Sequence, residues 1–435
     1  MHTSILLLPM LALAACLPSG PVDDPGEDPG TELHEPPGER VASSKARETS
    51  PAASDADVAS LTAGNRAFAM DMYHQLQQPG QNLFFSPHSI SVALAMTYAG
   101  AEGTTEAELA DVLGFTLPEV TTHAAFNALD LALKSRADLP EEEAGDGFAL
   151  SIVNQAFGQT GYPFEAPFLD VLATNYGAAV YLLDFSADPE GSRTAINDWV
   201  LEVTNERIED LLPAGSITDL TRLVLANAIY FKASWSVPFS PADTADADFT
   251  LLDGSVASVP TMHGTLDSSC ATGAGWTAAT LPYVGSQLDM VLLVPDTGAF
   301  ESVEASLDGA ALDAMLGALG ECALTIALPK LTVRTDAALV PPLQALGVVD
   351  AFDPNVADFS GMSTTSDLYV TGVFHQAFVA VDEQGTEAAA ATAVVIGEES
   401  APMPLMLDVD RPFLFAVRDR PTGAVLFLGR ILDPR

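Results

Sequence analysis

The spacing of hydrophobic residues changes partway along the chain. In its first half, apolar side chains recur three and four positions apart, which predicts amphipathic helices. These stretches are VASLTAGNRAFAMDMYHQL, SISVALAMTYAG, TTEAELADVLGF and SRTAINDWVLEVTNERIEDLL, with the shorter strand-like runs NLFF and FALSIVNQAFGQ and the helix-to-strand run FLDVLATNYGAAVYLLDF between them. Strand-like runs dominate the second half: RLVLANAIYFKASW, LDMVLLVPD, CALTIALPKLTV, GVFHQAFVAVDE, FLFAVRD and AVLFLGRIL. This order predicts an α+β fold with large, mostly antiparallel sheets.

One segment gives conflicting signals. VDEQGTEAAAATAVVIGEES, residues 381–400, carries five alanines between Glu387 and Ala393. Alanine is the best helix former, yet this run follows an alternating strand and ends in β-branched Val394, Val395 and Ile396. Taken alone, the segment is best explained as an exposed alanine-rich helix or linker.

Composition limits the possible functions. The chain has 435 residues, 48% of them hydrophobic, which is ample for a sizeable core. Its formal net charge is −42. Such a surface repels nucleic acid and anionic lipid, so a nucleic-acid partner is excluded.

The N-terminus has the features of an export signal. Residues 1–15 form a short apolar run that is too short to span a membrane, although no Lys or Arg precedes it. The run ends in Leu-Ala-Ala before Cys16, which resembles a bacterial lipobox and predicts lipidation of Cys16. An ordinary signal peptide cleaved nearby is the alternative. Residues 16–57 are rich in Pro, Gly and acidic residues and predict a disordered tether, leaving a folded domain over residues 58–435. The protein is therefore expected outside the cytoplasm, as a membrane-anchored lipoprotein or a secreted protein.

Eight blocks in the folded part resemble the serpin family of serine protease inhibitors, in the family's order and spacing. They are NLFFSPHSISVALAM, GAEGTTEAELADVL, LVLANAIYFKASWSVPFSPADTADADF, VPTMH, LPYVGSQLDMVLLVPD, LPKLTVRTDAALVPPLQALGVVDAFDPNVADFSGMS, VFHQAFVAVDEQGTEAAAATA and RPFLFAVRDRPTGAVLFLGRILDP. The resemblance implies about nine helices, three β-sheets and an exposed reactive-centre loop. It also implies a suicide-substrate inhibitor. A serine-class or papain-like cysteine protease cleaves the loop, and the loop then inserts into the main sheet and traps the acyl-enzyme.

The resemblance explains the alanine-rich segment as the hinge of the loop. The hinge residues it implies are Glu383, Gly385, Thr386, Glu387, Ala388, Ala389, Ala390, Ala391 and Thr392. If Thr386 faces inward in the sheet, every second residue up to Ile396 does so as well. None of these inward residues is charged or a proline, so each tolerates burial in a sheet. We therefore expect the alanines to allow insertion and not to form a stable helix.

The scissile bond is counted from Glu383 by the spacing common in the family. That count places Glu399 and Ser400 on either side of the bond, although a shift of a residue or two is open because the loop is long. Glu398 and the Ile396–Gly397 bond are the other candidates. A glutamate at this position suits a protease with a cationic specificity pocket.

Other positions match a polar cluster under the opening strands. Ser86, Ser89, Asn227 and His375 match that cluster, Trp235 matches the tryptophan where insertion starts, and Lys330 is expected to pair with Glu383. A hydrolase triad of Ser86, His375 and Asp382 is the competing reading, but Ser86 precedes a proline at a helix start and not a strained nucleophile elbow.

The remaining expectations concern partners and cofactors. No histidine or cysteine spacing predicts a metal site, and no glycine-rich motif predicts a nucleotide, so we expect no cofactor. Cys270 and Cys322 are far apart in sequence and are interpreted as two buried thiols, although export permits a disulfide. The expected partner is a protease, and the protein itself is expected to be a monomer. A non-inhibitory serpin that acts as a binding module is the alternative function.

Overall fold

The computed structural model describes residues 35–137, 149–364, 368–386 and 404–435. The predicted signal peptide, Cys16, the hinge beyond Thr386 and the Glu399–Ser400 bond lie outside these residues. All that follows concerns the compact unit Glu35–Arg435.

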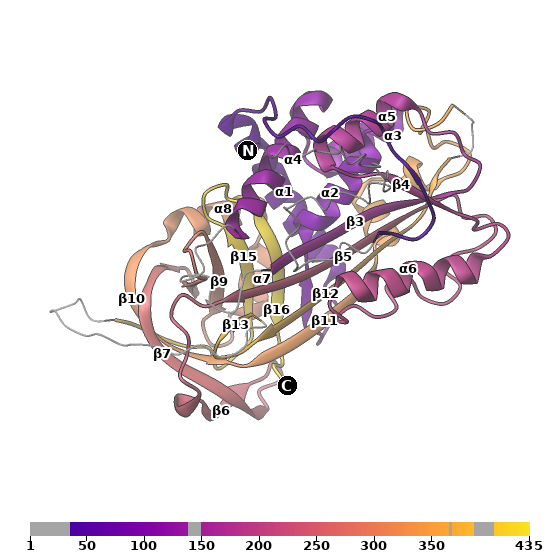
Figure 1. The fold of residues 1–435 in the computed structure, drawn as a ribbon. Coiled ribbons are helices and arrows are strands. Elements are labelled where there is room, and N and C mark those ends of the chain that lie inside the picture. Colours follow the sequence, from indigo (N-terminus) through magenta and orange to yellow (C-terminus); the bar gives the residue numbers. More distant parts are fainter. Residues whose placement is uncertain (1–34, 138–148, 365–367, 387–403) are drawn as a thin grey trace, which may run out of the picture. The chain divides into compact units, whose positions relative to one another are not determined.

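Nine α-helices lie in the described residues (Figure 1). They are α1 (Asp55–Leu76), α2 (Pro87–Tyr98), α3 (Gly103–Val112), α4 (Glu119–Lys134), α5 (Ala166–Val171), α6 (Pro189–Val203), α7 (Phe300–Ser306), α8 (Gly309–Ala318) and α9 (Val340–Leu346). Single turns occur at η1 (Ser135–Ala137), η2 (Leu172–Tyr176), η3 (Pro241–Asp243) and η4 (Asp350–Phe352). The predicted helix over 192–212 was wrong in its second half, because the helix ends at Val203 and Ile208 and Leu212 pack on the sheet from a non-helical segment.

The first hydrogen-bonded sheet has seven strands in the order β1-β4-β3-β5-β13-β12-β11. Their bounds are β1 (Glu39–Val41), β3 (Ala149–Gln159), β4 (Val180–Leu183), β5 (Leu223–Ser234), β11 (Leu331–Ala338), β12 (Val370–Val381) and β13 (Gly385–Thr386). Strands β5 and β12 also pair directly with each other, in parallel, below the short strand β13. The β5–β12 junction is where the serpin resemblance predicts that a new strand enters.

The remaining strands form a nine-stranded network that runs β14-β10-β7-β8-β9-β15-β16-β2, with β6 paired to β7. Their bounds are β2 (Leu83–Phe85), β6 (Ala245–Thr250), β7 (Val256–Gly273), β8 (Trp276–Pro282), β9 (Leu288–Pro295), β10 (Gly320–Pro329), β14 (Leu405–Asp408), β15 (Phe413–Asp419) and β16 (Val425–Ile431). The long strand β7 belongs to both halves of this network, since it pairs with β6 and β10 before it reaches β8. The two sheets expected beside the main sheet are therefore joined through β7.

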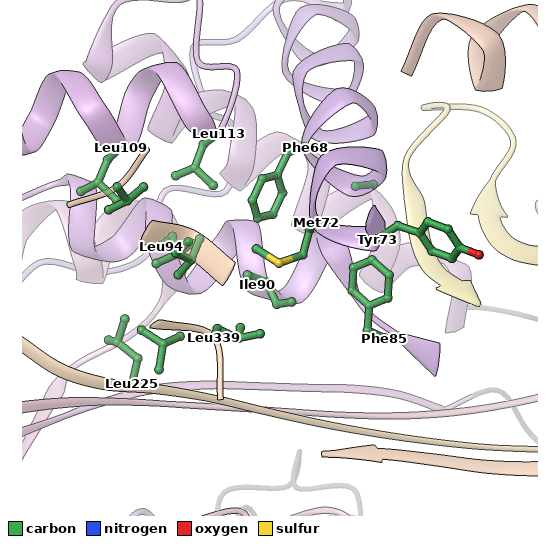
Figure 2. Packing of buried hydrophobic residues seen from close by; sticks show 14 of the residues in the cluster. Phe68, Met72, Tyr73, Phe85, Ile90, Leu94, Leu109, Leu113, Leu225 and Leu339 are labelled. Carbon is green, nitrogen blue, oxygen red and sulfur yellow. The ribbon is translucent and has the colours of Figure 1, made fainter. Parts of the chain in front are cut away.

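Hydrophobic clusters cover both faces of the main sheet. On one face, α1 and α2 pack Phe68, Met72 and Ile90 into a cluster that also contains Leu225 of β5 (Figure 2). On the other face, α6 packs Ile196 and Val200 on β3, β4 and β5. Each strand therefore sends alternate side chains into different cores, as its sequence pattern predicts.

The prediction of an unfolded tether up to residue 57 was wrong for the part that the structure describes. Residues 39–41 pair with β4 as an edge strand. Further on, the Arg47 guanidinium donates to Asn127 Oδ1 at 2.9 and 3.0 Å and also binds Asp130. Backbone pairing at a sheet edge and ion pairs require few apolar residues, which is why composition did not reveal this attachment.

The two cysteines form a disulfide, so the prediction of two thiols was wrong. Cys270 and Cys322 are joined, with their Cα atoms 5.8 Å apart. They lie on the neighbouring antiparallel strands β7 and β10, where Cys270 faces Gly320 and Cys322 faces Ser268. The sequence separation of 52 residues did not reveal this proximity, because only the strand register creates it.

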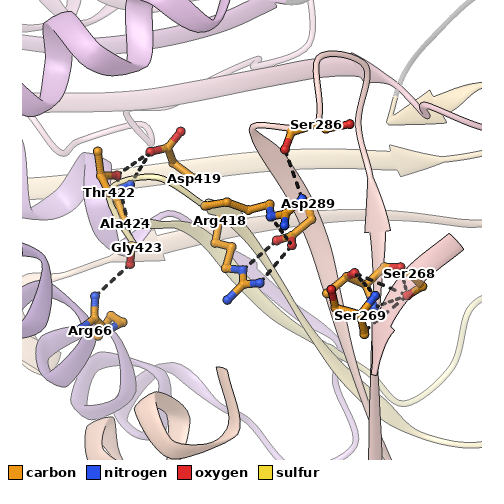
Figure 3. Close-up of polar contacts among 12 residues, drawn as sticks. Arg66, Ser268, Ser269, Ser286, Asp289, Arg418, Asp419, Thr422, Gly423 and Ala424 are labelled. Atoms are coloured by element: carbon orange, nitrogen blue, oxygen red, sulfur yellow. Dashed lines mark hydrogen bonds and ion pairs between the residues drawn. The ribbon is translucent and has the colours of Figure 1, made fainter. Parts of the chain in front are cut away.

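A buried ion pair also links two strands of the nine-stranded network. The Arg418 guanidinium donates to both carboxylate oxygens of Asp289, at 2.8 and 3.0 Å (Figure 3). Asp289 is buried, so its charge requires this bidentate partner.

Candidate functional site: the opening line of the main sheet

Strand β13 lies between β5 and β12 at one end of their junction. Thr386 pairs with Ala233 of β5 on one side and with Val381 of β12 on the other. Below it, β5 and β12 pair directly, and the last such pair is Tyr230 with Phe378. Thr386, the first residue of the predicted insertion strand, therefore already lies in the main sheet.

Thr386 is fully buried, and its side chain has a polar partner. Its hydroxyl lies 2.8 Å from the hydroxyl of Tyr283. Burial raises the pKa of Tyr283, which keeps the phenol neutral. Tyr283 stacks on Trp235 with ring centroids 4.6 Å apart. Neither Tyr283 nor its bond to Thr386 was predicted from the sequence.

Close backbone contact fixes the residue at position 385. A Cβ atom at Gly385 would overlap the carbonyl oxygen of Ala233 and lie 2.8 Å from Ser234 Cα. Glycine is therefore the residue that lets β13 approach β5 this closely.

Trp235 holds the turn that precedes β13. Its indole N–H donates to the carbonyl oxygen of Asp382 at 3.0 Å, and its backbone N–H donates to the carbonyl oxygen of Gln384 at 2.8 Å. The Asp382 carboxylate accepts from the backbone N–H groups of Gln384 and Gly385. The turn is thus held through its backbone groups.

Glu383 and Lys330 form the predicted ion pair, with Lys330 Nζ 2.6 Å from Glu383 Oε2. The other carboxylate oxygen accepts from the hydroxyl of Thr244 at 2.8 Å. Burial raises the pKa of Glu383, but the hydrogen bonds from Lys330 and Thr244 outweigh it, and the net pKa is lowered. Glu383 therefore stays ionised at neutral pH.

The structure brings Ser86, Ser89, Asn227 and His375 together under β5 and β12. The Ser86 backbone N–H donates to His375 Nε2 at 3.1 Å. Because Nε2 accepts, Nδ1 carries the ring proton and donates to Asn227 Oδ1. The Asn227 amide donates to Ser89 Oγ at 2.8 Å.

Asn154 of β3 is a further member of this cluster that sequence reasoning missed. It lies opposite Asn227 in the strand register, and its Oδ1 accepts from Ser89 Oγ at 3.2 Å. The signal was present, since a polar residue stands within the otherwise apolar run FALSIVNQAF. The cluster thus links β3, β5, β12 and the start of α2.

His375 is neutral in this setting. Burial lowers its pKa to about 3. A second proton on the ring would also place Nε2–H against the N–H of Ser86, where no acceptor is available. The cluster therefore requires the neutral imidazole.

The same geometry excludes the hydrolase triad. His375 contacts the backbone nitrogen of Ser86, and the Ser86 hydroxyl donates instead to the Leu426 carbonyl oxygen at 2.7 Å. Ser86 is fully buried. Asp382 binds backbone amides at the hinge turn. No nucleophile is activated here or open to substrate.

The described residues hold no group of three or more His, Cys, Asp or Glu side chains arranged to bind a metal ion. Within that same part of the chain, no helix has the length and hydropathy needed to cross a bilayer. The site is thus the β5–β12 junction of the main sheet, with the short strand β13 between the two strands at one end. Polar contacts hold β13, and the polar cluster joins β5 and β12 where they pair directly.

Comparisons with known proteins agree with this architecture. The family model described as serpin (serine protease inhibitor) matches residues 63–434, so the chain belongs to the serpin family. Members of this family generally act on target proteases as inhibitors and not as enzymes.

Individual relatives cover nearly the whole folded part. An uncharacterized serpin-like protein of Thermococcus kodakarensis is 38% identical over 373 residues, 85% of this chain and 84% of that protein. Leukocyte elastase inhibitor A of Rattus norvegicus is 35% identical over 397 residues, 86% of this chain and 99% of that protein. The solved structure of human thyroxine-binding globulin with its ligand has a TM-score of 0.75 and 29% identity, covering 87% of this chain and 99% of that one. This fold therefore also occurs in a thyroxine-binding protein.

Proposed function

We propose that this protein inhibits serine-type endopeptidases as a suicide substrate. Cleavage downstream of the hinge releases residues 386–396, which enter the main sheet between β5 and β12 and trap the acyl-enzyme. The observation that carries the proposal is the position of β13, which already pairs with both strands.

The strand register supports continued insertion. Since Thr386 faces Ala233 and Val381, a strand extended in the same register brings Ala389 between Tyr230 and Phe378. Those two residues form the last direct pair of β5 and β12, so separation of the strands starts at a small alanine. Because β5 and β12 are in register with each other, the new strand pairs with both without a shift.

Further along this register, Thr392 reaches Asn227 and His375. The neutral His375–Asn227 hydrogen bond then has to open, and a threonine side chain faces the same side of the sheet as that pair. The Thr392 hydroxyl can both donate and accept a hydrogen bond, so it can bind Asn227 and His375 after they separate. The polar cluster therefore closes the sheet before insertion and receives a polar residue afterwards.

The proposed context of this activity is extracytoplasmic. Cys16 is proposed as the lipidated residue that attaches a monomeric inhibitor to a membrane, and Glu399–Ser400 as the bond attacked. A serine protease with a cationic specificity pocket is the partner that this bond suits.

The test is complex formation with a panel of serine and cysteine proteases that includes a glutamyl-specific enzyme. An SDS-stable complex together with a released C-terminal peptide is expected for the wild type. Thr386→Arg places a charge in a fully buried position, so this variant is expected to be cleaved without trapping. Thr332→Arg is the matched control, because Thr332 is exposed on β11 of the same sheet. Cleavage of the wild type without any complex contradicts inhibition and favours a binding module.

A further inference from the structure

The N-terminal part of the described chain joins the fold as an additional strand at the edge of the main sheet. We call residues 35–48 the entry segment. Its strand β1 pairs antiparallel with β4, with Glu39 opposite Leu182. Beyond β1, Lys45 Nζ lies 2.8 Å from the carboxylate of Asp170. These contacts fix the chain to the sheet edge well before α1 begins.

The strand register places β1 at one end of the main sheet. One row of paired residues crosses four strands there: Glu39, Leu182 of β4, Gly158 of β3 and Leu223 of β5. Leu223 is the first of the 12 residues of β5, and the hinge strand β13 lies beside Ser234, the last one. The two ends of β5 are about 36 Å apart. The chain therefore enters the fold at the end of the sheet opposite the hinge (Figure 1).

The proposed insertion ends at the same row of residues. Thr386 faces Ala233, so a strand that continues in this register brings Ile396 beside Leu223. The proposed bond, at Glu399, follows about 10 Å further along the chain. A protease joined there as an acyl-enzyme is thus carried from the hinge end to the entry end. Four strand spacings, about 19 Å, then separate the new strand from β1.

A trapped protease takes up more room than that separation. A domain of about 230 residues has a diameter of about 45 Å, so the protease reaches the entry segment. Residues 16–34 join the predicted lipidation site, Cys16, to this segment. Fully extended, they span at most about 60 Å. A protease therefore fits between the fold and a membrane at Cys16 only if most of this length is kept.

The composition of residues 16–34 agrees with a spacing role. They include five acidic residues and four prolines but no Lys or Arg. Repulsion between like charges and the stiffness of proline favour an extended chain. The acidic side chains are also repelled by anionic lipid. Both effects favour distance between the fold and a membrane surface.

We infer that residues 16–34 are a spacer that makes room for the trapped protease at the anchored end of the main sheet. The protease first meets the loop at the hinge end, and insertion then carries it into the space between the entry segment and the membrane. This inference rests on the proposed function, including attachment through Cys16, and names the place where the inhibited protease is held.

Energy transfer between two dyes tests where the protease is held. The chain has three cysteines, and Cys270 and Cys322 are bonded to each other, so Cys16→Ser leaves no free thiol. In that background, Glu39→Cys places a dye on the exposed strand β1, and Ser286→Cys places one in the β8–β9 turn (Figure 3).

Ser286 is the matched control position because its turn lies at the hinge end, where the Val284 N–H donates to the carbonyl oxygen of Ser234 at 2.9 Å. The reference is the non-covalent encounter with a protease that lacks its catalytic serine. On trapping, transfer from a labelled protease is expected to rise for Glu39→Cys and to fall for Ser286→Cys. An SDS-stable complex in which transfer to Glu39→Cys does not rise overturns the inference and leaves inhibition standing.

A second experiment tests the length of the spacer. The chain from Cys16 onward is coupled through the Cys16 thiol to neutral phosphatidylcholine vesicles that carry a maleimide lipid. Deletion of residues 20–33 leaves a connection of at most about 15 Å, which is much shorter than a protease. On vesicles, the shortened chain is expected to be cleaved but to form complex severalfold less often than the full-length spacer. Free in solution, it is expected to trap normally.

A chain in which Gly-Ser repeats of equal length replace residues 20–33 is the matched control, and it is expected to trap normally on vesicles. Equal trapping by the shortened and full-length chains on vesicles overturns the spacer. Loss of trapping by the shortened chain in solution overturns it as well, because the deletion then acts without a membrane. A full-length chain that forms no complex, coupled or free, overturns the proposed function itself.

Discussion

His375 of β12 is hydrogen-bonded through Nδ1 to Asn227 Oδ1 of β5, directly across the β5–β12 junction of the main sheet. The bond depends on a neutral imidazole, because Nε2 accepts from the Ser86 backbone N–H. The closed state of the sheet is thus tied to the protonation state of one buried side chain.

Acid is therefore expected to destabilise the protein through His375. Burial lowers its pKa to about 3 in the folded state, against about 6.5 when unfolded. Between these values the unfolded chain binds the extra proton, so stability falls as pH decreases from about 6.5 toward 3. His375→Gln is expected to remove roughly 3–5 kcal/mol of this pH dependence, measured by urea unfolding across that range. Parallel stability profiles for variant and wild type contradict the assignment.

Gly385→Ala is expected to expel β13 from the sheet. Its Cβ atom would overlap the Ala233 carbonyl oxygen, and the Thr386–Tyr283 hydrogen bond would be lost with the strand. We expect a loss of about 1–3 kcal/mol in the free energy of unfolding and faster amide exchange at Thr386. Gly320→Ala is the control, since its added Cβ in β10 meets no atom within 4 Å. Unchanged exchange at Thr386 would show that β13 tolerates the methyl group.

The Lys330–Glu383 ion pair is expected to be worth about 1 kcal/mol, because Lys330 is more than a third exposed. A double-mutant cycle with Lys330→Met and Glu383→Gln measures this coupling. Loss of Lys330 is also expected to raise the pKa of Glu383, since the ammonium group favours the carboxylate. A coupling energy near zero would contradict a role of this ion pair in holding the hinge turn.

Removal of the disulfide is expected to destabilise the protein by about 2–4 kcal/mol, since it closes a long loop. The variant carries Cys270→Ser and Cys322→Ser, and guanidinium unfolding measures the loss. A reducing agent is expected to lower the stability of the wild type but not that of this double variant. Two free thiols in the untreated wild type would be incompatible with the bond.

Much of the main sheet could be predicted from sequence, for physical reasons. Alternation in GVFHQAFVAV sends Phe374 and His375 to opposite faces, and the structure shows that arrangement. For Thr386 the inward position is a condition of the prediction, and the structure shows Thr386 buried. The resemblance to the serpin family predicted the polar cluster and the Lys330–Glu383 ion pair.

Features that depend on non-local register could not be predicted. The Cys270–Cys322 bond exists because β7 and β10 are neighbours in a particular register. Asn154 joins the polar cluster because β3 places it opposite Asn227. The end of α6 at Val203 was missed because Ile208 continues the helical spacing while packing on the sheet from a strained segment.

The most direct test of the account is the melting temperature of the protein before and after a single cut in residues 387–403. A strand that enters the centre of the main sheet adds hydrogen bonds to both β5 and β12, so the cut protein is expected to melt at a clearly higher temperature than the intact one. Identical melting temperatures would mean that no strand had entered, and would contradict inhibition by insertion.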